Sequence, residues 1–418
     1  MLSYIIEGGK KLNGEVYASG SKNASLPILA TSILNPNPVT FYNIPDIEDI
    51  RITLKILEIL GCKIIRNSGK ITISSRDMKN TEIPKELMHK LRSTVILAGA
   101  IIGRFKKAKF SYPGGCNIGA RPIDLHLKAF KELGINVEEC LEYINCSTNM
   151  IKGTRIELEF PSVGATENII LSSIYAKGTT HIIGSAKEPE IVDLAKCLNK
   201  MGAKIYGAGT KEITICGVEK LHSAQYSVMT DRIETGTLLC ATAITKGNIK
   251  IIKANPENLI EVLYKLKQMG CKITINRDTI ILKSPNTIKS INIETNPYPY
   301  FPTDMQPIIS AVLTKAEGKS IIKENIFENR FNYCTELKKM GAKIKIENQT
   351  IEIDGTKELI GTNVSSKDLR GGAALVLAGL VAKGTTKVGN AEYILRGYEK
   401  LDEKLIKLGA NIKLKKVV

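Results

Sequence analysis

Six segments of the chain share one pattern of apolar and polar positions: an amphipathic stretch closes on Leu/Met-Gly, and an alternating run follows. The glycines of this pattern are Gly61, Gly134, Gly202, Gly270, Gly341 and Gly409, so it recurs every 68 to 73 residues. Glycine directly after an amphipathic run is typical of a helix C-terminus, because it adopts a left-handed backbone without steric strain. In several copies a second alternating run follows after a turn, which predicts a β-hairpin.

A second series of segments, nearly uniformly apolar, alternates with the first. It includes "STVILAGAIIG", "NIILSSIYAKG", "TGTLLCATAITKG", "PIISAVLTKAEG" and "GGAALVLAGLVAKG". A helix that is apolar on all sides has to be buried. The repeat therefore predicts an α/β (α+β) fold of six βαβαββ units, three in each of two domains, with helices inside and sheets outside. A solenoid with only a binding role is disfavoured, because this repeat of ~70 residues exceeds the usual 20 to 45.

Composition narrows the class of protein. The 418 residues are 43% apolar and 24% charged, which is ordinary for a globular protein, and no apolar run reaches the ~18 residues of a membrane span. The start of the chain lacks the apolar stretch of a signal peptide. Nine cysteines without any C-x-x-C predict free thiols in a reducing compartment, which we expect to be the cytoplasm. With four dispersed histidines, no metal site is expected.

The formal charge of +17 raises the possibility of a nucleic-acid partner. Against it, the lysines are evenly spread, tryptophan is absent and aromatics are only 5% of residues, so bases would find few stacking platforms. A basic field suits small polyanionic substrates equally well. We therefore expect small-molecule substrates, with no nucleic-acid partner, no membrane and no cofactor; no P-loop motif occurs.

Nine short segments carry the candidate chemistry, in order from one end of the chain to the other. They are "GSKNASLPILA" from Gly20, "PGGCNIGARPIDLH" from Pro113, "SVGATEN" from Ser162, "EPEIVDLA" from Glu188, "DRIETGT" from Asp231, "FPTDMQP" from Phe301, "FENRF" from Phe327, "DLRGGAALVLAG" from Asp368 and "RGYE" from Arg396. Together they resemble the UDP-N-acetylglucosamine 1-carboxyvinyltransferase family of enolpyruvyl transferases. Any one segment is weak evidence, whereas nine in register are specific.

The resemblance implies the same two-domain, inside-out α/β barrel that the repeat predicts. It assigns residues 22–229 to an inserted domain and residues 1–21 with 230–418 to a discontinuous one, so that the crossovers fall at Lys22 and Asp231. It also implies transfer of an enolpyruvyl group from phosphoenolpyruvate to the 3'-hydroxyl of UDP-N-acetylglucosamine, with release of phosphate. Such a reaction commits the sugar nucleotide to peptidoglycan, and hence supports cell shape and division.

Phosphoenolpyruvate needs cationic side chains, because its carboxylate and phosphate are anionic and guanidinium groups bind such groups bidentately. The resemblance assigns Lys22, Arg121 and Arg396 to these anionic groups. Arg330 and Arg370 are expected to contribute to the same electropositive site.

Cys116 lies in a glycine-rich loop before a predicted helix. Pro122 fits the first turn of that helix, so Arg121 is expected at a helix N-terminus, where the dipole favours an anion. Nearby positive charge lowers a thiol pKa from about 8.5, which suits a general acid. The resemblance implies protonation of the methylene carbon, a covalent adduct or product release, and alkylation by fosfomycin; the choice between acid and adduct stays open.

The remaining candidates concern the sugar nucleotide. By resemblance, Asp304 is the base for the sugar hydroxyl and Asn23 hydrogen-bonds the reaction adduct. The residues assigned to UDP-N-acetylglucosamine are Arg92, Arg121, Pro122, Ile123, Asp124, Leu125, Ser162, Val163, Gly164, Asp304 and Ile326. Without the resemblance, Asp304 between prolines and the glycine of "SVG" are ordinary turn residues.

Two alternatives stay open at the level of sequence. Shikimate 3-phosphate enolpyruvyl transferases share the sixfold architecture and the cosubstrate but work without a catalytic cysteine, so "PGGCNIGARP" favours the nucleotide sugar. A regulatory paralogue with slow turnover is the other. The chain also departs from the family pattern at Leu395, where aspartate is usual, and at Tyr333, where histidine is frequent. Both lie close to arginines that the assignment uses, Arg396 and Arg330.

Overall fold

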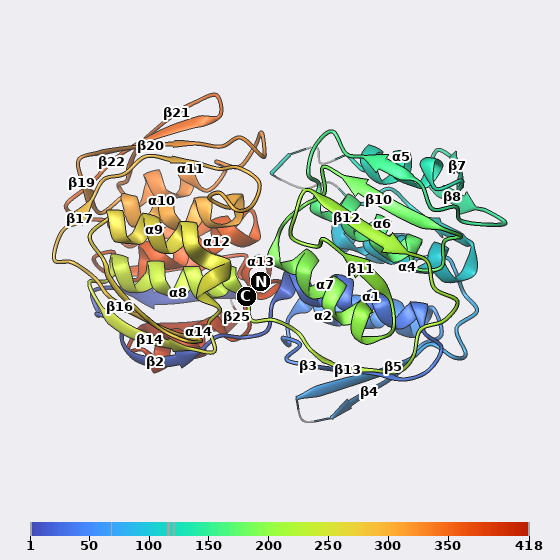
Figure 1. Ribbon diagram of the computed structural model, residues 1–418. Helices are drawn as coiled ribbons and strands as arrows, with labels where there is room; N and C mark the ends of the chain where they lie inside the picture. Colours follow the sequence, from blue (N-terminus) through green and yellow to red (C-terminus); the bar gives the residue numbers. More distant parts are fainter. Residues whose placement is uncertain (1, 68, 115–117, 120–121, 417–418) are drawn as a thin grey trace. The chain divides into compact units, whose positions relative to one another are not determined.

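A computed structural model describes residues 2–67, 69–114, 118–119 and 122–416, which group into two compact units (Figure 1). Unit 1 holds residues 2–19, 118–119 and 230–416, and unit 2 holds the described residues between 20 and 114 and from 122 to 229. Each unit has its own hydrophobic core.

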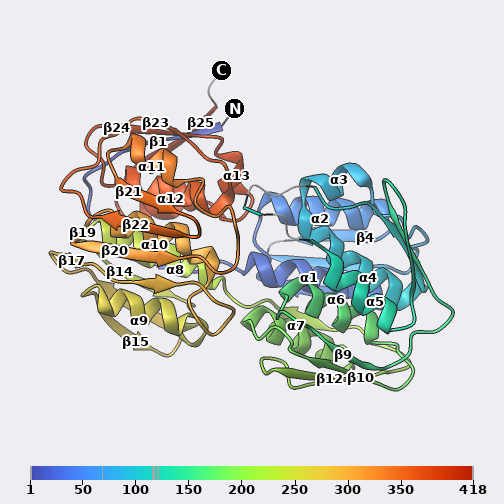
Figure 2. The same ribbon diagram turned by 90° about the horizontal axis from the view of Figure 1, so that it is seen from above.

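Three nearly all-buried helices form the centre of each unit. In unit 1 they are α8 (Arg232–Ile244), α10 (Gln306–Leu313) and α12 (Leu369–Gly379), and in unit 2 α1 (Lys22–Leu34), α4 (Val95–Phe105) and α6 (Val163–Ser173). In both units these helices pack against one another, and the sheets lie at the periphery (Figures 1 and 2). The predicted fold, with helices inside and sheets outside, is confirmed.

Amphipathic and short helices cover the remaining faces. They are α2 (Glu48–Ile59), α3 (Lys85–Lys90), η1 (Arg92–Thr94), α5 (Asp124–Glu132), α7 (Pro189–Lys200), η2 (Pro256–Leu259), α9 (Ile260–Gln268), η3 (Thr303–Met305), α11 (Cys334–Lys339), α13 (Glu392–Leu395) and α14 (Leu401–Lys407). The longest helices, α1 and α8, have 13 residues each, and within the described ranges no helix has the length and apolar character of a membrane span.

Most of the sheets have four strands, three antiparallel and one parallel at the edge. Unit 1 has β1 (Leu2–Glu7), β2 (Asn13–Tyr17), β14 (Asn248–Ile252), β15 (Lys272–Asn276), β16 (Thr279–Lys283), β17 (Ile288–Lys289), β18 (Ile293–Glu294), β19 (Ala316–Glu317), β20 (Lys319–Lys323), β21 (Lys343–Glu347), β22 (Thr350–Asp354), β23 (Asn363–Ser365), β24 (Thr385–Gly389) and β25 (Asn411–Lys416). Unit 2 has β3 (Val39–Tyr42), β4 (Lys63–Asn67), β5 (Lys70–Ser74), β6 (Lys107–Phe110), β7 (Asn136–Glu139), β8 (Ile144–Ser147), β9 (Arg155–Glu157), β10 (Thr179–Ile183), β11 (Lys204–Tyr206), β12 (Glu212–Cys216) and β13 (Gln225–Ser227).

The βαβ part of each repeat is visible in the strand pairing. In the repeats built on α6, α10 and α12, the strand before the buried helix pairs in parallel with the strand after it: β9 with β10, β18 with β20, and β23 with β24. All six glycines that close the amphipathic helices have a positive φ, between 78° and 103°, as their spacing predicts. The repeat that follows α4 has only three strands, β6-β8-β7, and an isolated parallel bridge between Glu82 and Lys109 stands where the fourth would be.

The repeats are not all contiguous in the chain, contrary to the simplest interpretation of the pattern. Strand β2 precedes α1 in sequence but pairs with β14 after α8, and β13 precedes α8 but pairs with β3 after α1. The chain thus exchanges first strands where it passes between the units. Strand β1 lies between β24 and β25, so the two ends of the chain complete one sheet. These pairings satisfy backbone groups that would otherwise be left at exposed sheet edges.

Candidate active site

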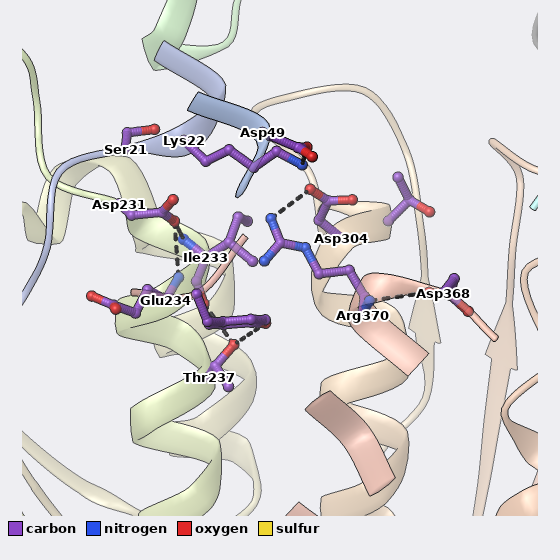
Figure 3. A network of polar contacts seen from close by, with 12 residues as sticks. Ser21, Lys22, Asp49, Asp231, Ile233, Glu234, Thr237, Asp304, Asp368 and Arg370 are labelled. Atoms are coloured by element: carbon purple, nitrogen blue, oxygen red, sulfur yellow. Dashed lines mark hydrogen bonds and ion pairs between the residues drawn. The ribbon is translucent and has the colours of Figure 1, made fainter. Parts of the chain in front are cut away.

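One carboxylate in unit 1 binds two arginines. Arg330 Nη2 donates to Asp304 Oδ1 over 3.0 Å. Arg370 Nη2 donates to Asp304 Oδ2 over 3.2 Å, and Figure 3 shows this second contact. Both arginines are only 3% exposed, whereas the Asp304 side chain is 29% exposed. The cluster therefore places two buried cations around one partly exposed anion.

Local structure fixes each member of this cluster. Asp304 lies in η3, directly before the buried helix α10. Arg370 is the second residue of α12, whose first turn is capped by the Asp368 side chain, since Asp368 Oδ1 accepts from the backbone N–H groups of Arg370 and Gly371. Arg330 also donates to the Thr303 carbonyl. Asp304 and Arg370 are far apart in sequence. Their side chains meet because the buried helices α10 and α12 begin next to each other.

The two arginines retain unused hydrogen-bonding capacity. Within the described residues, Arg330 Nε and Arg370 Nη1 are buried and have no hydrogen-bond partner. Burial alone would lower the pKa of Arg370, but Tyr398, Asp304 and Asp231 outweigh it, so that its pKa lies above the ordinary value. A buried, charged donor without an acceptor costs free energy, which a bound anion would recover.

Aromatic side chains support both guanidinium groups. The Phe327 ring centroid lies 5.6 Å from Arg330 Cζ, and the Tyr398 ring centroid lies 5.1 Å from Arg370 Cζ. Tyr398 belongs to the loop after α13 that also carries the half-buried Arg396. Ile326 is half-buried next to Phe327.

Lys22 in unit 2 has an acidic partner. It is the first residue of α1, whose N-cap Ser21 accepts from the Ala24 N–H, and Asn23 follows it half-buried. Lys22 Nζ lies 2.7 Å from Asp49 Oδ2 of α2, and the Asp49 side chain is completely buried (Figure 3). The ion pair fixes the ammonium group at the N-terminus of a buried helix.

The described nucleotide candidates of unit 2 lie at or near the starts of three helices. Pro122 to Leu125 lead into α5, and Ser162 to Gly164 begin α6, with the Ser162 side chain accepting from the Ala165 N–H. The starts of these helices lie close together, because a Cβ at Gly164 would stand 3.0 Å from His126 Cε1. Arg92 is half-buried in η1, directly before α4.

The predicted start of α5 was wrong by two residues. The helix begins at Asp124 with Ile123 as N-cap, so Pro122 precedes the helix and does not occupy its first turn. Pro122 leaves no backbone N–H to be satisfied there, and its fixed φ suits an extended approach as well as a helical one.

Two of the predicted residues, Cys116 and Arg121, lie outside the described residues. Among the described cysteines, Cys62 and Cys271 are buried core residues. Burial raises the thiol pKa to about 12 at Cys62, Cys146, Cys197, Cys271 and Cys334, and also raises that of Cys240. These six thiols therefore stay protonated and unreactive near neutral pH. No three His, Cys, Asp or Glu side chains in the described ranges are grouped to hold a metal ion.

Comparison with known proteins identifies the family of this chain. The model of the family described as EPSP synthase (3-phosphoshikimate 1-carboxyvinyltransferase) matches residues 6–405. The chain is also 49% identical over 413 residues, 99% of both sequences, to UDP-N-acetylglucosamine 1-carboxyvinyltransferase 2 of Caldanaerobacter subterraneus subsp. tengcongensis. It is 45% identical to a protein of the same name in Clostridium tetani, over 99% of both sequences. The chain belongs to the enolpyruvyl transferase family.

Solved enolpyruvyl transferases share the fold. The enolpyruvyl transferase NikO of Streptomyces tendae superimposes with a TM-score of 0.89 at 24% identity, covering 99% of this chain and 98% of the other. EPSP synthase of Acinetobacter baumannii superimposes with a TM-score of 0.77 at 19% identity, and both chains are covered completely.

Several residues around the candidate site were not found from the sequence. Asp368 carried a usable signal, because an aspartate directly before a glycine-rich apolar run is a typical N-cap. Asp49 had only a weak one, an acidic residue in the first turn of an amphipathic helix. The contact between Tyr398 and Arg370 had no sequence signal, because the two residues lie in separate segments that only the folded structure brings together.

A buried acid, Glu167, lies four residues after Val163 in α6. It is 3% exposed, and burial, together with Glu190 and Glu188 at the start of α7, holds its pKa well above the ordinary value. Between the unfolded pKa and this raised folded pKa, the folded protein keeps a proton that the unfolded chain releases. The free energy of unfolding therefore falls as pH rises through that window.

We predict that Glu167→Gln removes this pH dependence, because glutamine has the shape of the protonated carboxyl group. Urea denaturation should show a larger stabilisation by the substitution at pH 8 than at pH 5. The same substitution at exposed Glu219 is the control and should change the unfolding free energy by less than about 0.5 kcal/mol. An equal effect of Glu167→Gln at both pH values would contradict the prediction.

Proposed function

We propose that this chain transfers the enolpyruvyl group of phosphoenolpyruvate to the 3'-hydroxyl of UDP-N-acetylglucosamine and releases phosphate. This is the first committed step of peptidoglycan precursor synthesis. Relatives 44–49% identical along nearly the whole chain, all named for this activity, support the choice of acceptor. The structural observation that carries the proposal is the pair of buried arginines around Asp304, each with an unused N–H group.

Phosphoenolpyruvate has two anionic groups, and unit 1 offers buried donors for one of them. We propose that Arg330 and Arg370 bind an anionic oxygen through Nε and Nη1, and that Arg396 binds nearby. Lys22, Asn23 and Arg121 are proposed to bind the same substrate and its tetrahedral adduct. Charge-assisted hydrogen bonds of this kind contribute roughly 1.5 to 3 kcal/mol each.

Asp304 is the proposed base for the sugar hydroxyl. In the structure each of its oxygens accepts from a guanidinium group, so both oxygens are already engaged. An anionic substrate that binds the same arginines shares their positive charge and loosens their hold on the carboxylate, which can then accept the proton of the sugar hydroxyl. The anion and the base thus compete for the same two cations, which couples phosphoenolpyruvate binding to activation of the base.

The sugar nucleotide is proposed to lie at the adjacent starts of α5 and α6. Helix N-termini present free backbone N–H groups and a positive dipole end, which suit a diphosphate. The residues proposed for uridine, diphosphate and sugar are Arg92, Arg121, Pro122, Ile123, Asp124, Leu125, Ser162, Val163, Gly164, Asp304 and Ile326. The close approach of His126 to Gly164 explains why glycine suits that position.

Cys116 is proposed to protonate the methylene carbon of phosphoenolpyruvate as a general acid. Its sequence neighbourhood supports this, because Arg121 lies five residues on and three glycines, Gly114, Gly115 and Gly119, lie in the same loop. Reaction with fosfomycin at this thiol and location in the cytoplasm are further proposals of the same kind.

Shikimate 3-phosphate is the second candidate acceptor, because the family model is described by that activity. We predict rapid phosphate release from phosphoenolpyruvate with UDP-N-acetylglucosamine and none above background with shikimate 3-phosphate. A steady-state assay of inorganic phosphate measures both. The opposite preference would overturn the proposed acceptor, and no release with either would favour a regulatory paralogue.

We also predict that Cys116→Ser lowers kcat by about a hundredfold or more, the usual contribution of a general acid. Cys116→Asp should keep substantial turnover, because a carboxylic acid can deliver the same proton, and should resist fosfomycin. Mass mapping of fosfomycin-treated protein should find the adduct on Cys116 and not on the buried thiols, for which Cys197→Ser is the control. Full turnover by Cys116→Ser would remove this thiol from the mechanism.

A further inference from the structure

Arg370 contacts a neutral side chain as well as the acidic Asp304. The Tyr398 ring lies 5.1 Å from Arg370 Cζ, and Tyr398 is completely buried in unit 1. Its hydroxyl group lies 2.9 Å from Thr237 Oγ1 of α8, which is also completely buried. Arg370 belongs to α12 and Thr237 to α8, so Tyr398 connects two of the three central helices.

The direction of this hydrogen bond follows from counting protons. The Thr237 hydroxyl has one proton, and it donates that proton to the Ile233 carbonyl over 2.7 Å (Figure 3). Tyr398 must therefore be the donor to Thr237. Burial, the largest cause, raises the pKa of Tyr398, so the phenol stays neutral and can donate. Because its proton is donated to Thr237, the phenol can interact with Arg370 only through its π electrons and its oxygen lone pairs.

A neutral tyrosine beside Arg370 affects the charge of the guanidinium group differently from an acidic side chain. Lys22 is held by the buried carboxylate of Asp49, 2.7 Å away. Arg370 already shares the carboxylate of Asp304 with another arginine, and a second carboxylate in place of Tyr398 would offset more of its charge and weaken its attraction for an anionic substrate. A phenol fixes the guanidinium group through dispersion and cation–π attraction while leaving its charge available.

We propose that Tyr398, oriented by Thr237, is a positioning residue that holds Arg370 for phosphoenolpyruvate. This inference rests on the proposed function, since it assigns a purpose to the charge on Arg370. Tyr398 touches the arginine and acts through it, so its loss should affect binding of phosphoenolpyruvate more than binding of the sugar nucleotide.

Two substitutions test the role separately. Tyr398→Phe removes the hydroxyl group and keeps the ring, and Thr237→Val removes its acceptor with little change in shape. Each should raise the KM for phosphoenolpyruvate about three- to tenfold, the effect of losing one hydrogen bond, while the KM for UDP-N-acetylglucosamine changes less than about twofold. Thr237→Ser keeps the hydroxyl group and should restore most of the affinity. If Tyr398→Phe does not fold, the comparison of Thr237→Val with Thr237→Ser still tests the positioning role.

Tyr333→Phe is the matched control. Tyr333 is another buried tyrosine of unit 1, and its hydroxyl group makes two 2.7 Å hydrogen bonds, to Ser310 and from Gln306. A general loss of packing would raise both KM values in all three variants. An equal rise for both substrates, the same selective rise in Tyr333→Phe, or an unchanged KM in both Tyr398→Phe and Thr237→Val would overturn the positioning role.

The wild-type protein separates this inference from the function on which it rests. Phosphate release by wild type with both substrates supports the proposed function, and its absence refutes that function. Wild-type turnover together with unchanged phosphoenolpyruvate KM in the two variants refutes only the role of Tyr398.

Discussion

The sharing of one carboxylate by two buried guanidinium groups is the interaction on which the candidate site depends. Asp304 satisfies one N–H group of Arg330 and one of Arg370, and each arginine keeps another donor without a partner within the described residues. Two buried cations that share one carboxylate and keep donors without acceptors are a costly arrangement unless the surroundings are rigid and an anion can bind. The Asp368 cap and the Tyr398 ring provide that rigidity.

The inside-out fold explains why the candidate residues gather at one kind of position. Each of the six buried helices has a candidate residue or a capping acid at or just before its start. They are Lys22 at α1, Arg92 before α4, Ser162 at α6, Asp231 at α8, Asp304 before α10 and Arg370 at α12. The body of each helix is apolar and committed to the core, so its N-terminus is the part left for chemistry. The dipole at that end favours anions, in keeping with two substrates that carry phosphate groups.

Much of the fold could be predicted from the sequence, because it rests on local signals. The glycines after the amphipathic helices, the all-apolar helices and the hairpins repeat six times, and each signal needs only a short window. The exchange of β2 and β13 could not be predicted, nor could the insertion of β1 between β24 and β25, because these pairings join residues hundreds of positions apart. Likewise, the resemblance named Asp304, Arg330 and Arg370, whereas Asp49 and Tyr398 emerged only from their contacts. Local sequence patterns therefore predict the helices and strands, whereas the contacts between distant residues are known only from the structure.

The competition between Asp304 and an anion for the two arginines is tested most directly by Asp304→Asn. Isothermal titration of phosphoenolpyruvate into this variant and into wild type compares the two dissociation constants, with Asp278→Asn on an exposed turn as a control for net charge. We predict that Asp304→Asn binds phosphoenolpyruvate more tightly than wild type, although turnover falls by about a hundredfold or more because the proposed base is lost. Unchanged or weaker binding in Asp304→Asn, or equal tightening in Asp278→Asn, would contradict it.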